Sequence, residues 1–147
     1  MKNKDFIPYQ ESLELKKLGF DEPCFFAFDN CSTPMRCSDL RTSEQKFNGV
    51  NYNSSSYTSQ PAYPQAFRWF REKYNIRIGI DYRTNDKDGY LYNISWEEWA
   101  NGENPPVLVW HHRNSWLGAN EPLTSYEEAE LACLRKLIQI VKQGGKQ

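Results

Sequence analysis

The C-terminal stretch SYEEAELACLRKLIQIVKQGG, residues 125–145, decides the fold. Ser125 and Glu128 have the spacing of a capping box, in which the hydroxyl and the carboxylate each accept a hydrogen bond from an exposed backbone N–H. Acidic side chains come first and basic ones last, which matches the helix dipole. One apolar face continues through the stretch and comprises Tyr126, Ala129, Cys133, Leu137, Ile140 and Val141. These features predict a helix from about Tyr126 to Gln143 that packs on a sheet.

Working outward, the preceding residues predict three strands. Isoleucines alternate with polar residues over 76–80, which is typical of a strand with one buried face. A polar turn that ends in Asp88-Gly89 favours a hairpin. The returning strand is expected over Tyr90–Trp96, and the apolar run Val107–His111 predicts a third, more central strand.

Another helix is expected before these strands. Pro64 suits its first turn, and apolar residues recur at helical spacing as far as Tyr74. Trp69 lies off this apolar stripe and is expected to be half exposed. Residues 64–142 are therefore expected to form a helix-strand-strand-strand-helix unit.

The N-terminal part predicts one helix, one strand and one loop. A short helix over 8–18 ends at Gly19, a residue that suits a left-handed cap. The aromatic run Cys24–Phe28 predicts a buried strand. In residues 31–60, thirteen of thirty are Ser, Thr or Asn, so a long irregular loop is expected, either functional or disordered. We expect a single α+β domain over 1–147, with a mostly antiparallel sheet of three to four strands and helices packed on one face.

Composition excludes several classes of protein. The length of 147 residues suits one domain, and 39% hydrophobic with 25% charged residues argues against disorder. No apolar run approaches a membrane span, and the N-terminus resembles no secretory signal, so a cytoplasmic protein is expected. The net charge of −1 provides no general attraction for nucleic acid or anionic lipid.

The cysteines Cys24, Cys31, Cys37 and Cys133 have neither close pairs nor zinc spacing. Reduced thiols are expected without a secretory signal, and Cys24 and Cys133 are expected in the core. No metal, disulfide or cofactor is expected.

Residues with catalytic chemistry are few. Adjacent residues His111 and His112 would point to opposite faces of a strand and cannot chelate one ion. Nothing in the sequence positions the Glu97/Glu98 pair for hydrolysis. An enzyme that uses Cys/His chemistry or this pair therefore remains only a third alternative.

Aromatic residues carry the functional hypothesis, because 5 Trp, 9 Tyr and 8 Phe exceed what a core of this size needs. Trp96, Trp99 and Trp116, together with Arg113, have the composition of a binding hot spot. Trp110 is expected to be buried instead. The alternative is that the other indoles also fill the core under the last helix.

Three segments together resemble a known family: LKKLGFDEPC at 15–24, QAFRWFREKY at 65–74 and YEEAELACLRKLI at 126–138. The set is similar to small uncharacterised proteins of bacteriophages and prophages, especially those of Bacteroides-like hosts. The resemblance implies a phage accessory protein in the cytoplasm of a bacterial host, and carries no activity or site residues. Such proteins often bind and block host machinery, including antiviral defences.

A nucleic-acid-binding module is the alternative, because double-stranded-RNA-binding domains share the helix-strand-strand-strand-helix order. Charge argues against it, since residues 76–123 hold four bases and seven acids, a net of −3. The last helix also begins with acids where phosphate contacts need lysines. The leading hypothesis is therefore a non-enzymatic accessory protein that binds a host protein or a small molecule, such as an inhibitor of host defence.

Overall fold

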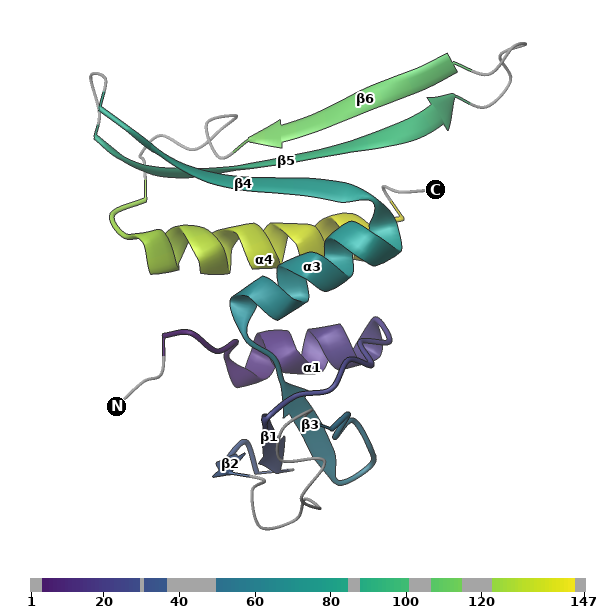
Figure 1. Cartoon of the computed structure of the whole chain (residues 1–147), viewed down its shortest axis with the longest axis vertical. Coiled ribbons are helices and arrows are strands. Elements are labelled where there is room, and N and C mark those ends of the chain that lie inside the picture. The colour runs from purple at the N-terminus through teal and green to yellow at the C-terminus, as the bar shows by residue number, and fades with distance from the viewer. Residues whose placement is uncertain are drawn as a thin grey trace. The chain divides into compact units, whose positions relative to one another are not determined.

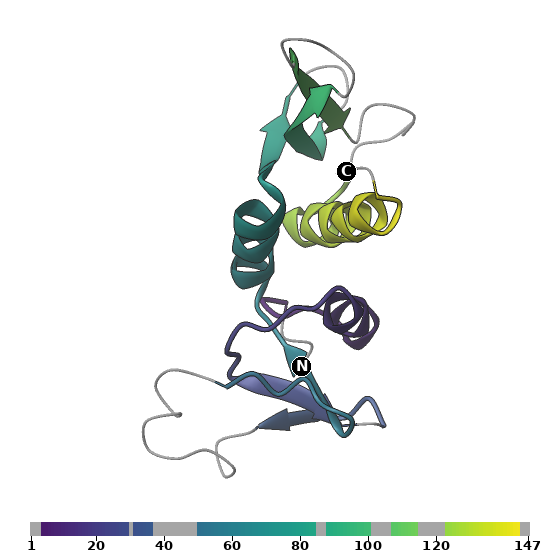
Figure 2. The same cartoon turned by 90° about the vertical axis from the view of Figure 1, so that its right-hand side faces the viewer.

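The computed structural model of the chain (Figures 1 and 2) describes residues 4–29, 31–36, 50–84, 88–100, 107–114 and 123–144. At 34–36, 83, 97–100 and 107–114 the backbone alone is described. The helices and strands, in chain order, are α1 (Tyr9–Lys17), β1 (Phe26–Asp29), β2 (Pro34–Arg36), β3 (Tyr57–Gln60), α3 (Tyr63–Tyr74), β4 (Ile76–Arg83), β5 (Gly89–Ala100), β6 (Val107–Asn114) and α4 (Tyr126–Lys142). The α+β class that the sequence predicts is confirmed.

Two compact units make up the chain, Met1–Trp69 and Phe70–Gln147. The first unit contains an antiparallel sheet with the strand order β2-β1-β3, and the second contains an antiparallel sheet with the order β4-β5-β6. The expectation that the strands form one sheet is therefore wrong. The reason is that β1 takes its partners from the polar segment that follows it, not from the later strands.

The segment 31–60, expected to be one irregular loop, contains the strands β2 and β3. Ser59 in β3 is only 1% exposed despite its polarity. Its hydroxyl accepts a hydrogen bond from the Tyr52 N–H at 2.8 Å, and its own N–H donates to the Asn53 side-chain oxygen at 2.8 Å. Composition misleads here because side-chain hydrogen bonds satisfy a buried polar strand. The rest of the expected loop, 37–49, lies outside the described residues.

Helix α1 and its C-terminal turn build part of the first unit's core. Gly19 has a φ of 89°, which lets the Phe20 N–H donate to the Leu15 carbonyl at 3.0 Å and close the helix. The Phe20 ring then meets Trp69 edge-on, with 5.5 Å between ring centroids. Trp69 is 4% exposed, so the expectation that it is half exposed is wrong: Phe20, from a distant part of the chain, covers it.

Cross-strand pairing in the second unit follows the predicted alternation. Ile76 at the start of β4 lies opposite Trp96, and Tyr82 at its end lies opposite Tyr90. Strand β5 extends to Ala100, beyond its expected end at Trp96.

Helix α4 packs on one face of the β4-β5-β6 sheet (Figure 1). The predicted contact residues are buried: Ala129, Cys133, Leu137 and Ile140. The predicted cap is also confirmed, because the Glu128 N–H donates to the Ser125 hydroxyl at 3.2 Å. The Glu128 carboxylate accepts hydrogen bonds from the Thr124 N–H at 3.0 Å and the Thr124 hydroxyl at 2.6 Å. In the part of the chain that the structure describes, no helix has both the length and the apolar character to cross a membrane.

Candidate functional site

Trp96 does not belong to the tryptophan surface that the sequence predicts. Trp96 is 3% exposed and follows Ile94, which is fully buried, by two residues on β5. Strand alternation places both on the same sheet face, so Trp96 belongs to the core and its assignment to a contact surface is wrong. Trp99 lies on β5 and Arg113 on β6, but their side chains are outside the described part, and Trp116 lies outside the described residues.

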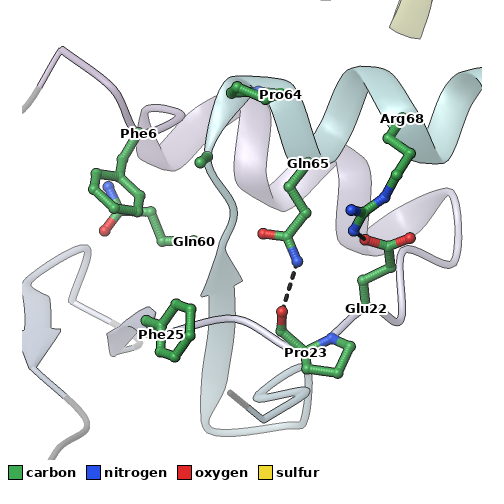
Figure 3. A pocket seen from close by; sticks show the side chains of 9 residues that line it. Phe6, Glu22, Pro23, Phe25, Gln60, Pro64, Gln65 and Arg68 are labelled. Atoms are coloured by element: carbon green, nitrogen blue, oxygen red, sulfur yellow. Dashed lines mark hydrogen bonds and ion pairs between the residues drawn. The ribbon is translucent and has the colours of Figure 1, made fainter. Parts of the chain in front are cut away.

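The first unit contains a groove with a cavity volume of about 670 Å³ (Figure 3). We call it the Phe25 groove. Its lining residues come from the N-terminal segment, the α1–β1 connection, the end of β3 and the start of α3: Phe6, Glu22, Pro23, Phe25, Gln60, Ala62, Pro64, Gln65 and Arg68. The volume falls within the range of about 300–1,000 Å³ that is typical of ligand sites.

Helix geometry and backbone bridges between distant segments hold the walls of the groove in place. Gln65 and Arg68 are three residues apart on α3, so the helix presents both side chains on one face. The chain opposite them is fixed at Cys24, whose N–H donates to the Val50 carbonyl at 2.8 Å and whose carbonyl accepts from the Val50 N–H at 2.9 Å. Phe6 is placed by an antiparallel bridge to Ala62.

Polar groups converge on one end of the groove. The Arg68 guanidinium donates to the Glu22 carboxylate at 2.8 Å, and the two side chains are 51% and 18% exposed. The Gln65 amide donates to the Pro23 carbonyl at 2.6 Å, and its oxygen accepts from the Cys24 thiol at 3.7 Å. Figure 3 shows Gln65 pointing across the groove between this ion pair and the aromatic end. The amide is held at both of its ends, so it forms a fixed polar centre.

Aromatic surface forms the other end of the groove. Phe25 is 44% exposed, although the run Cys24–Phe28 predicts a buried strand. That expectation is wrong for Phe25 because β1 begins only at Phe26, one residue later. The Phe6 ring packs edge-on against Phe26, with 4.7 Å between ring centroids. A ligand in the groove would therefore meet apolar rings at one end and an ion pair at the other.

A second exposed aromatic surface lies in the second unit, and we call it the tyrosine face. It consists of Tyr82, Tyr90 and Tyr126. The Tyr82 and Tyr90 ring centroids are 5.0 Å apart, and those of Tyr90 and Tyr126 are 5.9 Å apart, both pairs with edge-to-face geometry. A backbone bridge between Tyr90 and Leu123 brings the start of α4 to this end of the sheet.

Exposure in the tyrosine face is high for side chains of this size. Tyr82 is 54% exposed and Tyr126 is 46% exposed. The helical pattern assigned Tyr126 to the buried face of α4, and this is only partly right, because Tyr126 stands at the first turn beyond the edge of the core. Partial burial and the neighbouring Glu130 carboxylate raise the pKa of the Tyr126 hydroxyl.

Thiols in the described residues are mostly buried and unreactive. Burial raises the pKa of Cys24 to about 12 and raises the pKa of Cys133 strongly, so both stay protonated at neutral pH. Cys31 is exposed and free, and Cys37 lies outside the described residues. No group of three or more His, Cys, Asp or Glu side chains in the described ranges is placed to hold a metal ion.

Both aromatic surfaces depend on contacts that are distant in sequence, which explains why sequence reasoning missed them. The groove joins residues up to 62 positions apart, from Phe6 to Arg68. One sequence feature points to part of the tyrosine face: the hairpin turn at Asp88-Gly89 predicts that the end of β4 pairs with the start of β5, which brings Tyr82 opposite Tyr90. The position of Tyr126 beside them follows only from the packing of α4.

Comparison with known proteins gives no relative: the chain matches no family model, no curated protein and no solved structure. The resemblance to phage proteins stays a prediction.

Proposed function

We propose that the protein is a non-enzymatic binding protein whose Phe25 groove receives an apolar or aromatic group of its partner. The partner is a host protein in the bacterial cytoplasm, and the protein acts there as a phage-type accessory factor that inhibits host machinery such as antiviral defence. A small molecule of the same chemistry would use the same groove.

The observation that carries the proposal is the composition of the groove. An exposed Phe25 ring and a solvent-accessible ion pair face the same cavity of about 670 Å³. Exposed aromatic side chains and arginines are the residue types that dominate binding energy at interfaces. Between them Gln65 is anchored by hydrogen bonds at 2.6 Å and 3.7 Å, so little side-chain entropy is lost when a ligand arrives.

The ion pair supports a binding role more than a structural one. Arg68 is 51% exposed, and an exposed pair of this kind contributes only about 0–1 kcal/mol to stability. A guanidinium is a planar, permanently charged donor group that recognises carboxylates with a defined geometry. The groove therefore offers directional hydrogen bonds beside an apolar surface, which is the usual composition of a specific site.

Capture from host lysate, followed by mass spectrometry, tests this proposal. Phe25→Ser and Arg68→Ala are expected to lose the captured protein while changing the melting temperature little, because the two residues are 44% and 51% exposed. Lys17→Ala is the matched control, since Lys17 also forms an exposed ion pair in the first unit, with Glu14 at 2.9 Å, outside the groove. Capture that survives both groove substitutions would contradict the proposal.

A nucleic-acid-binding module remains the second candidate because α3, β4, β5, β6 and α4 follow one another in the order of a double-stranded-RNA-binding domain, with α4 on one sheet face. The acids Glu127, Glu128 and Glu130 at the start of α4 argue against phosphate contacts there. Nuclease treatment of the lysate separates the two candidates. Loss of the captured proteins after nuclease treatment, together with binding of duplex RNA at low salt, would favour this second function.

A further inference from the structure

The tyrosine face presents aromatic rings that the second unit does not use to close its core. Of the residues whose side chains the structure describes, the large hydrophobic ones that are exposed are Phe25, Tyr82 and Tyr126, and two of these three belong to this face. The edge-to-face contacts of Tyr90 with both neighbours leave ring surface of Tyr82 and Tyr126 open to solvent. Exposed aromatic patches of this kind mark contact sites.

Charge around the tyrosine face has one sign among the described side chains. The carboxylates next to its elements are Asp88, which precedes β5, and Glu127 and Glu130 in the first turns of α4. Asp81 is not among them, because it precedes Tyr82 on β4 and so points to the other sheet face, where it accepts a hydrogen bond from the Asn93 amide at 2.9 Å. The described cations of the second unit belong to other segments, namely the end of α3, the start of β4 and the second half of α4: Arg71, Lys73, Arg77, Arg135, Lys136 and Lys142. Arg83 and Lys87 also belong to the hairpin, but their side chains are outside the described part.

We propose that the tyrosine face docks a cationic segment of a protein partner, with an arginine or lysine side chain against the open faces of Tyr82 and Tyr126. The ring faces attract the cation through their quadrupoles, and arginine also stacks flat on them. The surrounding carboxylates complement the remaining positive charge of the segment and steer its approach. The same carboxylates disfavour contact with phosphates.

Glu130 lies close enough to the face for its negative charge to raise the pKa of the Tyr126 hydroxyl, together with partial burial of that ring. The carboxylate of Glu128 is instead held by the Thr124 hydroxyl and N–H, at 2.6 Å and 3.0 Å. The surface belongs to the second unit and does not involve the Phe25 groove, so either site can be tested without the other.

Fluorescence polarisation with a labelled nine-residue arginine peptide, the full chain and low salt tests the proposal. The Tyr82→Ser/Tyr126→Ser variant is expected to bind the peptide about tenfold more weakly, from the loss of two exposed cation–π contacts. Tyr82→Phe/Tyr126→Phe keeps both rings and is expected to bind within about twofold of the wild type. A thermal melt of each variant checks that the second unit stays folded.

Charge variants separate ring contacts from simple attraction. Glu130→Gln is expected to weaken peptide binding by about threefold, whereas Glu72→Gln, an exposed carboxylate on α3, is expected to leave it unchanged. A glutamate peptide of equal length is expected not to bind. The proposal is overturned if the serine double variant binds the arginine peptide as tightly as the phenylalanine double variant, or if duplex RNA binds this surface instead.

Discussion

Replacement of Leu137 by Ala is the most direct probe of how α4 holds the second unit together. Leu137 is fully buried on the face of α4 that packs on the sheet, between Cys133 and Ile140, which are 0% and 5% exposed. The substitution removes three carbon groups, worth about 2.4 kcal/mol at about 0.8 kcal/mol each. The cavity that remains costs a further 1–2 kcal/mol or so. Because Ala and Leu have similar helix propensities, the total loss is expected to be about 3.5–4.5 kcal/mol.

Urea unfolding followed by far-UV circular dichroism and by tryptophan fluorescence measures this loss. Coincident transitions from the two probes justify a single free energy of unfolding. Gln139→Ala is the matched control, because Gln139 is exposed on the same helix, and a change of less than about 0.5 kcal/mol is expected. A loss below about 1 kcal/mol for Leu137→Ala would refute the packing of α4 described above.

Three further predictions concern the cap, the thiols and a cross-strand contact. The lowered pKa of Glu128 means that its ionised carboxylate stabilises the fold at pH values above the ordinary carboxyl pKa of 4.5. This stability is lost as the pH falls through the lowered pKa. Thermal melts of a Glu128→Gln variant at several pH values should lack this part of the acid dependence. Iodoacetamide at pH 7.5 should label Cys31 quickly and Cys24 only in denaturant, because the pKa of Cys24 is raised to about 12; rapid native labelling of Cys24, read by mass spectrometry, would show this to be wrong. A Cβ at Gly79 would lie 2.8 Å from the Asn93 side-chain oxygen. Gly79→Ala should therefore destabilise the wild type but not an Asn93→Ala variant. Equal effects in both would count against the pairing of Gly79 with Asn93 across β4 and β5.

Local signals explain what the sequence predicted correctly. The bounds of α4 follow from the Ser125 cap and a continuous apolar stripe, both of which lie within one segment. The alternation of Ile76 with polar residues likewise predicts β4, because a strand with one buried face leaves a period of two. The same period of two along β5 places Trp96 on the buried face with Ile94, which contradicts the hypothesis that Trp96 belongs to an exposed tryptophan surface.

Features that depend on distant contacts were not predicted. Strand β3 was missed because Ser59 is buried through hydrogen bonds to Tyr52 and Asn53, and composition reads such residues as loop. Trp69 was expected at the surface because nothing in its own helix shows that Phe20 covers it. The Phe25 groove combines segments from both ends of the first unit, so no local pattern in the sequence could reveal it.

One NMR titration tests most directly whether the Phe25 groove is a binding site. Amide spectra of the full chain would be recorded with increasing amounts of small aromatic acids and amides, for the wild type, Phe25→Ser and Lys17→Ala. Saturable shifts confined to residues 22–25 and 60–68 are expected in the wild type and in Lys17→Ala, with affinity at least about tenfold weaker in Phe25→Ser. Shifts that avoid these residues, or that persist with the same affinity in Phe25→Ser, would contradict the assignment of the groove as the site of binding.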